Sequence, residues 1–306
     1  MTMFPSVPFT GPSSPHELPS GRVVCSEHRL KVCPYCCSDY SFMDEILGYD
    51  EDQEFEEDED NDDDYYDDDS DSSEDGLPAL ESDDLDFRPR IGTGRVLFQK
   101  FNKPRPTDTP SSLFPSSRTV LTRLPRFVRR NKPTELLIYT DGACLDNGHA
   151  NARAGCGFVF SSTPGPSSYC NFRLEKQGPT GEVYQPTSNR AELRAVIAAL
   201  RFRAWDVEGF RSIVIATDSE YVVEGATRWV RTWLKNGWTT RTGALVKNKD
   251  LWQALLGEAE KWSERDVKIT FWWIPRDQNI EADHWARHGA NMEQMHQYGD
   301  IQGIGV

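Results

Sequence analysis

The chain has 306 residues, 37% hydrophobic and 11% aromatic, which is enough material for one large or two modest packed domains. No apolar run is long enough to cross a bilayer, and the N-terminal residues lack the features of a signal or transit peptide, so we expect a nuclear or cytoplasmic protein. The net charge of −15 comes from one block, since 24 acidic and no basic residues lie between Asp44 and Asp86; the rest has 34 basic against 25 acidic residues, a net +9 that suits nucleic acid.

The N-terminal segment divides into an unstructured part and a cysteine-rich part. Residues 1–24 are rich in Pro, Ser and Gly and are predicted to be disordered. Residues 25–43 place four ligand-type side chains within twelve positions, a set typical of structural zinc sites. This pattern predicts a small zinc knuckle, although an incidental or reactive cysteine cluster has the same composition. The candidate zinc ligands are Cys25, His28, Cys33 and Cys36.

Two further segments precede the domain-like part of the chain. Residues 44–87 are so acidic and so poor in aliphatic side chains that we expect disorder. This block could mimic nucleic acid, or screen the basic segments of the chain when no substrate is present. Either this block or the Cys/His segment could bind a protein partner. Residues 88–133 are rich in Pro, Ser and Arg and are predicted to form a basic linker. At the other end, residues 293–306 are expected to be a C-terminal tail.

The residues from 134 to 292 have the pattern of an α/β domain. Apolar runs bounded by turn residues predict strands at 136–141, 155–162, 168–176, 211–218 and 267–275. Helical spacing predicts helices at 189–205, 219–237, 248–262 and 280–292, with Gly225 a break and Gly237 a C-terminal cap of the second.

Two of the predicted strands end in the same way, with Thr, Asp and a small residue. They place Asp141 and Asp218 at strand ends, where open α/β sheets build their sites. If the strands are parallel neighbours, the two carboxylates repel unless divalent cations lie between them. Taken singly, Asp141 fits a turn, Asp218 a helix cap, Glu192 a capping box with Asn189, and Asp283 a first-turn acid. Taken together, the four carboxylates predict a site for a hard cation.

At these residues the chain resembles a known family. The segments YTDGACLDNG, TSNRAEL, ATDSEYV and NIEADHWAR occur in that order and are similar to the four carboxylate motifs of type 1 ribonuclease H. The resemblance implies a five-stranded mixed sheet flanked by helices. It also implies that Asp141, Glu192, Asp218 and Asp283 bind two Mg²⁺ ions, with Mn²⁺ as a substitute. The implied reaction hydrolyses the RNA strand of RNA–DNA hybrids and leaves 5′-phosphate and 3′-hydroxyl ends.

A basic, tryptophan-rich segment follows the third carboxylate motif. Residues 226–249 contain six basic residues and no acid, and Trp229 and Trp233 share one helix face. That face could be a core stripe beside solvated charges, or a surface for phosphate contact and stacking. The segment resembles the basic handle of ribonucleases H, which grips the DNA strand. With the carboxylate motifs, it implies substrate contacts by Gly142, Asn147, Thr187, Asn189, Trp229, Trp233, Lys247 and Asn248.

Two departures from the family pattern bear on activity. The loop before Asp283 is only PRDQN and contains no histidine, and Glu220 stands where an amide-bearing residue is common. A histidine shuttle is therefore not expected here. The alternatives to the enzyme are a catalytically weak hybrid-binding protein and an interaction protein that uses the Cys/His and acidic segments.

Overall fold

The structure is a computed structural model that describes residues 16–18, 23–33, 38–43, 90–118, 124–163 and 165–303. The predictions for residues 1–15 and 44–89, and the candidate ligand Cys36, lie outside these ranges. The central elements are β8 (Lys132–Leu145), β9 (Arg153–Val159), β10 (Tyr169–Arg173), α3 (Ser188–Arg201), β11 (Ser212–Thr217), α6 (Lys249–Glu264), β12 (Lys268–Trp273) and α7 (Ile280–Ala290).

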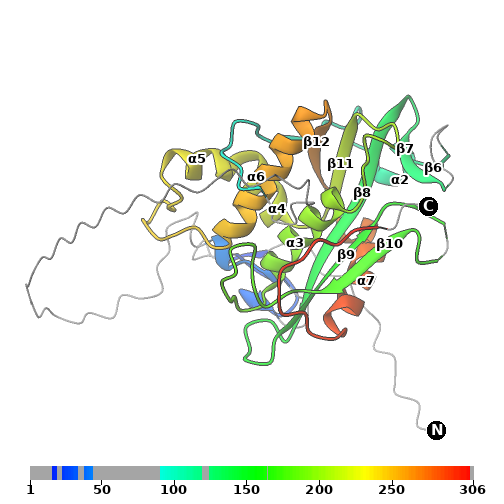
Figure 1. Cartoon of the computed structure of the whole chain (residues 1–306). Helices are drawn as coiled ribbons and strands as arrows, with labels where there is room; N and C mark the ends of the chain where they lie inside the picture. Colours follow the sequence, from blue (N-terminus) through cyan, green and yellow to red (C-terminus); the bar gives the residue numbers. More distant parts are fainter. Residues whose placement is uncertain are drawn as a thin grey trace, which may run out of the picture.

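The five predicted strands form the central part of a mixed sheet that has eight strands in the described residues, and their order is β10-β9-β8-β11-β12. The first three form an antiparallel meander, and β11 runs parallel to both β8 and β12. The long β8 lies at the centre of the domain (Figure 1). Because β8 and β11 are parallel neighbours, their carboxyl ends lie side by side. The α/β fold class is confirmed.

Residues 88–133 do not behave as the predicted linker where the structure describes them. β5 (Gln99–Lys100) adds a parallel strand beside β12, and β7 (Arg126–Arg129) pairs with the first half of β8 and with β6 (Ser116–Ser117). The short helix α2 (Pro110–Leu113) begins at a capping box. Phe98 and Phe114 from this segment are buried against the sheet. The prediction was wrong because strands of two to four residues give almost no hydrophobic periodicity.

Helices cover both faces of the sheet, and glycines let them approach. A Cβ at Gly142 would lie 2.1 Å from the backbone nitrogen of Glu192 in α3. A Cβ at Gly157 would lie 2.4 Å from the backbone nitrogen of Ala286 in α7. Gly142 pairs with Cys156, the neighbour of Gly157, and adjacent strand residues point to opposite faces. Therefore α3 and α7 pack on opposite faces of the meander.

The helical segment after β11 has three parts. The helix α4 (Glu220–Glu224) leads into the π-helix η1 (Gly225–Trp229) and then into α5 (Val230–Lys235). A Cβ at Gly225 would lie 2.3 Å from the ring of Trp252, so only glycine fits there. Gly225 thus changes the winding of the helix rather than ending it, while Gly237, with a φ of +66°, follows its C-terminal end.

The C-terminal residues pack onto the domain instead of projecting as a tail. Lys176 and Gln177 donate backbone hydrogen bonds to Met295 and His296. Arg201 forms an ion pair with Asp300. None of the helices in the described ranges is long and apolar enough to cross a membrane.

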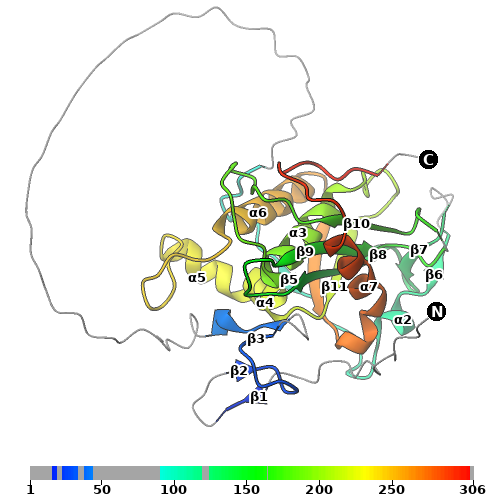
Figure 2. The ribbon, with the colours of Figure 1, turned by 90° about the horizontal axis from the view of Figure 1, so that it is seen from below.

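A small N-terminal module lies beside α4 (Figure 2). Its described residues contain four two-residue strands in two antiparallel pairs, followed by a helical turn at residues 41–43. The first two strands lie within residues 1–24, so the predicted disorder is wrong at the residues that form them. The ring of Phe42, in this module, contacts the main domain. Its centroid lies 5.3 Å from the ring centroid of Tyr221 and 5.4 Å from that of Trp229. The strands are β1 (His16–Glu17), β2 (Val23–Val24), β3 (Val32–Cys33) and β4 (Ser38–Asp39).

Candidate active site

The structure brings the four predicted carboxylates to one end of the sheet. Asp141 lies within β8 and Asp218 follows β11 directly. Ala216 pairs with Tyr139 in parallel register, so two residues further along each strand Asp218 comes beside Asp141. Glu192 on α3 and Asp283 on α7 complete the group, and the charges of all three act on the Asp141 carboxyl.

Gly142 positions Glu192 in this group. The missing Cβ of Gly142 leaves the space that the backbone of α3 occupies at Ala191 and Glu192. Any larger residue would push α3 away from β8 and withdraw the Glu192 carboxyl. The structure thus gives this glycine a packing role, in addition to the substrate contact that the family resemblance implies.

The electrostatics of the strand carboxylates reflect burial and crowding. Asp141 is only 5% exposed. Burial raises its pKa well above the usual range for aspartate, and the negative charges of Asp218 and Asp283 raise it further. Burial also raises the pKa of Asp218, although the positive charge of Arg276 opposes this effect. A metal-free site therefore favours protonation, and a bound cation would favour the charged forms.

The carboxyl of Glu192 responds in the same way. Burial raises its pKa to about 8, while the hydroxyl of Ser219, which donates a hydrogen bond to Oε2, acts in the opposite direction. The same hydroxyl accepts a bond from the backbone N–H of Val222, so Ser219 caps α4 and orients Glu192 at once.

Positive and amide groups from the short loop before α7 reach into the cluster. The Arg276 guanidinium lies 2.6 Å from Oδ1 of Asp283 and 3.8 Å from Oδ2 of Asp218. Asn279 donates from Nδ2 to Oδ1 of Asp218 at 2.6 Å and to the carbonyl oxygen of Thr140 at 3.0 Å. The five-residue segment 275–279 therefore neutralises and orients the carboxylates without a histidine.

The donor set fits a hard divalent cation. Four carboxylates around a partly buried position are the oxygen ligands that Mg²⁺ and Mn²⁺ prefer. Within the described ranges, no three of these carboxylates bring one oxygen each within 4.8 Å of one another. Arg276 lies against both Asp218 and Asp283 and offsets part of the repulsion between them.

The two tryptophans that are predicted to contact substrate belong to the core and also line a pocket. Trp229 and Trp233 are 8% and 9% exposed, and their rings pack together with a centroid distance of 6.0 Å. They line a pocket of about 390 Å³ that Arg241, Lys247 and Phe42 also line. Five of the six basic side chains of this segment are exposed, namely Arg228, Arg231, Lys235, Arg241 and Lys247.

The predicted polar contact residues are engaged within the protein. Thr187 caps α3 by accepting from the backbone N–H of Arg190. Asn147 is 2% exposed and donates to the hydroxyl of Ser188, and Asn189 is 7% exposed. Asn248, with a left-handed φ of +57°, donates to the hydroxyl of Tyr221. These side chains can meet a backbone phosphate or sugar only at their remaining accessible edges.

Sequence reasoning missed several residues of the site. Arg276 and Asn279 contact two of the carboxylates, and Tyr221 accepts hydrogen bonds from Asn248 and from the indole of Trp252. The sequence signal for Arg276 and Asn279 was their place in the five-residue loop just before α7. This loop keeps their side chains close to Asp283 in the first turn of that helix.

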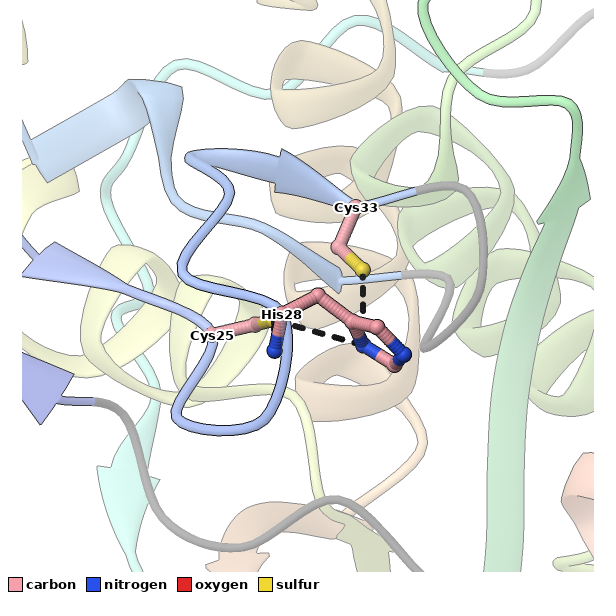
Figure 3. A group of neighbouring side chains, drawn as sticks. All are labelled: Cys25, His28 and Cys33. Carbon is pink, nitrogen blue, oxygen red and sulfur yellow. Dashed lines mark hydrogen bonds between the residues drawn. The ribbon is translucent and has the colours of Figure 1, made fainter.

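The N-terminal candidate ligands also come together in the described part of the chain. The thiols of Cys25 and Cys33 and the imidazole of His28 form one group (Figure 3). Burial opposes ionisation of Cys25, but hydrogen bonds from backbone amides, including that of His28, lower the pKa of its thiol to about 7.

Sequence comparisons with known proteins agree on one family. The RNase H family model matches residues 133–291. Ribonuclease H of Treponema pallidum is 38% identical over 142 residues, which cover 44% of this chain and 78% of the relative. Ribonuclease HI of Haemophilus influenzae is 31% identical over 174 residues, 56% of this chain and 99% of the relative. A solved structure, LC9-RNase H1, is 30% identical over 51% of this chain and 72% of its own, with a TM-score of 0.37.

Proposed function

The chain belongs to the type 1 ribonuclease H family and is an enzyme of that class; on this premise we propose that it hydrolyses the RNA strand of RNA–DNA hybrids at the carboxylate site. The observation that carries the proposal is the convergence of Asp141, Glu192, Asp218 and Asp283 from two strands and two helices. A scaffold protein would gain nothing from gathering four acids at one point, where burial raises the pKa of Asp141, Glu192 and Asp218.

The four carboxylates would hold two Mg²⁺ ions, or Mn²⁺ in their place. When bound, these ions would supply an activated water and stabilise the leaving 3′-oxygen of an in-line displacement, giving 5′-phosphate and 3′-hydroxyl ends. The protein contributes positioning: Asn279 fixes the rotamer of Asp218, and Ser219 fixes that of Glu192. With the ions supplying the chemistry and these side chains the positioning, no histidine is required in the loop before Asp283.

The basic surface next to the site would hold the hybrid. Exposed Arg241 and Lys247 flank the pocket lined by Trp229 and Trp233, which suits the phosphates and sugars of the DNA strand. The RNA strand would then pass over the carboxylates, close to Gly142 and Asn147. Recognition of its 2′-hydroxyls at this position would distinguish RNA from DNA.

The test is a cleavage assay with the full-length protein, labelled RNA–DNA hybrid, and Mg²⁺ or Mn²⁺. Matched RNA–RNA and DNA–DNA duplexes serve as substrate controls. We expect cleavage of the RNA strand of the hybrid alone, and its loss in Asp218→Asn. Binding of the hybrid without cleavage at any concentration of either ion would contradict the proposal and favour a non-catalytic hybrid-binding protein.

A further inference from the structure

The N-terminal module contains a side-chain group that the hydrolytic site does not use. Nδ1 of His28 lies 3.8 Å from Sγ of Cys25 and 3.6 Å from Sγ of Cys33 (Figure 3). All three ligand atoms lie within 4.8 Å of one another. Both thiols are buried, while the imidazole is exposed. Three soft or borderline donors thus converge on one point at the edge of the module.

These distances match the geometry of tetrahedral zinc. Bond lengths of about 2.3 Å to sulfur and about 2.0 Å to nitrogen, at tetrahedral angles, place the sulfur and nitrogen ligands about 3.6 Å apart. The two observed sulfur–nitrogen distances, 3.6 and 3.8 Å, lie at this value. An ion could therefore enter the group with only small movements of the side chains.

The backbone around the group has the form of a tight ligand-bearing loop. The N–H of Cys25 donates to the carbonyl of Leu30, and the N–H of Arg29 donates to the carbonyl of Cys25. Arg29 has a φ of +56°, which closes the turn within six residues. The N–H of His28 donates to Sγ of Cys25 at 3.1 Å, so the loop already stabilises negative charge on this sulfur.

The described residues of the module form only a small core. Its strands are two residues long, and its buried cluster consists of Cys25 and Cys33 with Tyr40 packed against them. Isolated two-stranded pairs of this size are marginal in water, and small units usually need a disulfide or a metal. A metal ion held by the two thiols and the imidazole would supply this stabilisation.

We propose that Cys25, His28 and Cys33 bind a structural Zn²⁺ ion. Binding requires both cysteines as thiolates and neutral His28 as an Nδ1 donor, so two thiol protons leave to solvent. The fourth ligand predicted from the sequence, Cys36, lies outside the described residues, and the proposal rests on the three that the structure places together. It is independent of the hydrolytic function.

The position of the module suggests what the ion would organise. Tyr40 packs against the two thiols, and its ring lies 6.5 Å from that of Phe42. Phe42 in turn contacts Tyr221 and Trp229, at the pocket that we assign to the DNA strand. A zinc ion at the knuckle would thus fix the chain segment that brings Phe42 to this surface.

The proposal is tested on the full-length protein, expressed with added zinc and then dialysed against metal-free buffer. We expect about one zinc ion per chain by mass spectrometry of the metal. X-ray absorption should show sulfur ligands at about 2.3 Å and a nitrogen ligand at about 2.0 Å. Zinc at the expected amount with oxygen ligands only would overturn the assignment, as would a wild-type protein that retains no zinc.

Matched variants locate the ion. Cys25→Ser and Cys33→Ser should lose at least about tenfold in bound zinc, while Cys170→Ser, a half-buried thiol on β10, should retain it. His28→Cys should keep the zinc and replace the nitrogen scatterer by sulfur, a readout that survives if a serine variant fails to fold. Zinc retained equally in both serine variants would contradict the proposal, because the ion would then bind elsewhere.

Discussion

Replacing Glu192 by glutamine should stabilise the metal-free protein while removing part of its response to magnesium. The ordinary pKa of a glutamate carboxyl is 4.5, and in the folded protein burial raises that of Glu192 to about 8. Because the folded-state pKa is raised, the stabilising contribution is complete below pH 4.5 and is lost as the pH rises through 8. Glu192→Gln has no proton to lose, so its stability does not decline in this way.

The size of the effect follows from the pKa difference. Between about pH 5 and 8 the unfolding free energy of the wild type should fall relative to Glu192→Gln by up to about 1.4 kcal/mol per pH unit. At pH 7 this sums to about 3 kcal/mol. We expect about half of that, because the side chain is only partly buried and water reduces the shift. The glutamine oxygen can still accept the hydrogen bond from Ser219.

The assay is urea denaturation of both proteins in magnesium-free buffer at pH 5.5, 6.5 and 7.5, repeated with Mg²⁺. The difference between the proteins should grow with pH. Added Mg²⁺ should stabilise the wild type more than the variant. Glu293→Gln, which alters an exposed glutamate on the C-terminal segment, serves as the control and should differ from the wild type by a constant amount. A pH-independent difference between wild type and Glu192→Gln would refute the reasoning.

Three further substitutions test other parts of the structure. Arg276→Ala removes a positive charge that pairs with two of the carboxylates, so the Mg²⁺ concentration for half-maximal cleavage should fall several-fold; an unchanged requirement would contradict this. Phe42→Ala uncovers the ring of Trp229 and should lower the Kd for hybrid by up to about tenfold, whereas a higher Kd in a binding titration would make Phe42 part of the binding surface. Arg194→Met leaves the buried carboxylate of Glu175 without its ion-pair partner and should lower the free energy of unfolding by about 3–5 kcal/mol in urea denaturation. The double variant Arg194→Met/Glu175→Leu should recover much of this stability, and no recovery would contradict the explanation.

The central part of the fold could be predicted because its signals are local and strong. Strands such as β11 are continuous apolar runs, and α3 has apolar residues at helical spacing, so their place in the chain follows from periodicity. The four carboxylates could be proposed as one site because each follows or occupies one of these elements, in an order that resembles a known family.

Other parts depend on contacts that periodicity does not encode. β5 and β7 are short and gain their stability from pairing with β12 and β8, which are distant in the sequence. Arg276 reaches Asp218 only because the parallel strands β11 and β12 end at the same edge of the sheet, where the loop with Arg276 begins. The packing of Phe42 against Trp229 joins segments almost two hundred residues apart, and no pattern in either segment signals it.

The central claim is that the four carboxylates act together as the centre that cleaves the hybrid. It is tested most directly by Asp141→Asn, which changes one buried oxygen donor to an amide of nearly the same shape. The measurement is single-turnover cleavage of the hybrid in Mg²⁺, together with the Kd for hybrid in magnesium-free buffer. We predict a rate loss of about a thousandfold or more with a Kd that changes less than about threefold. A variant that cleaves within about tenfold of the wild-type rate would contradict the account.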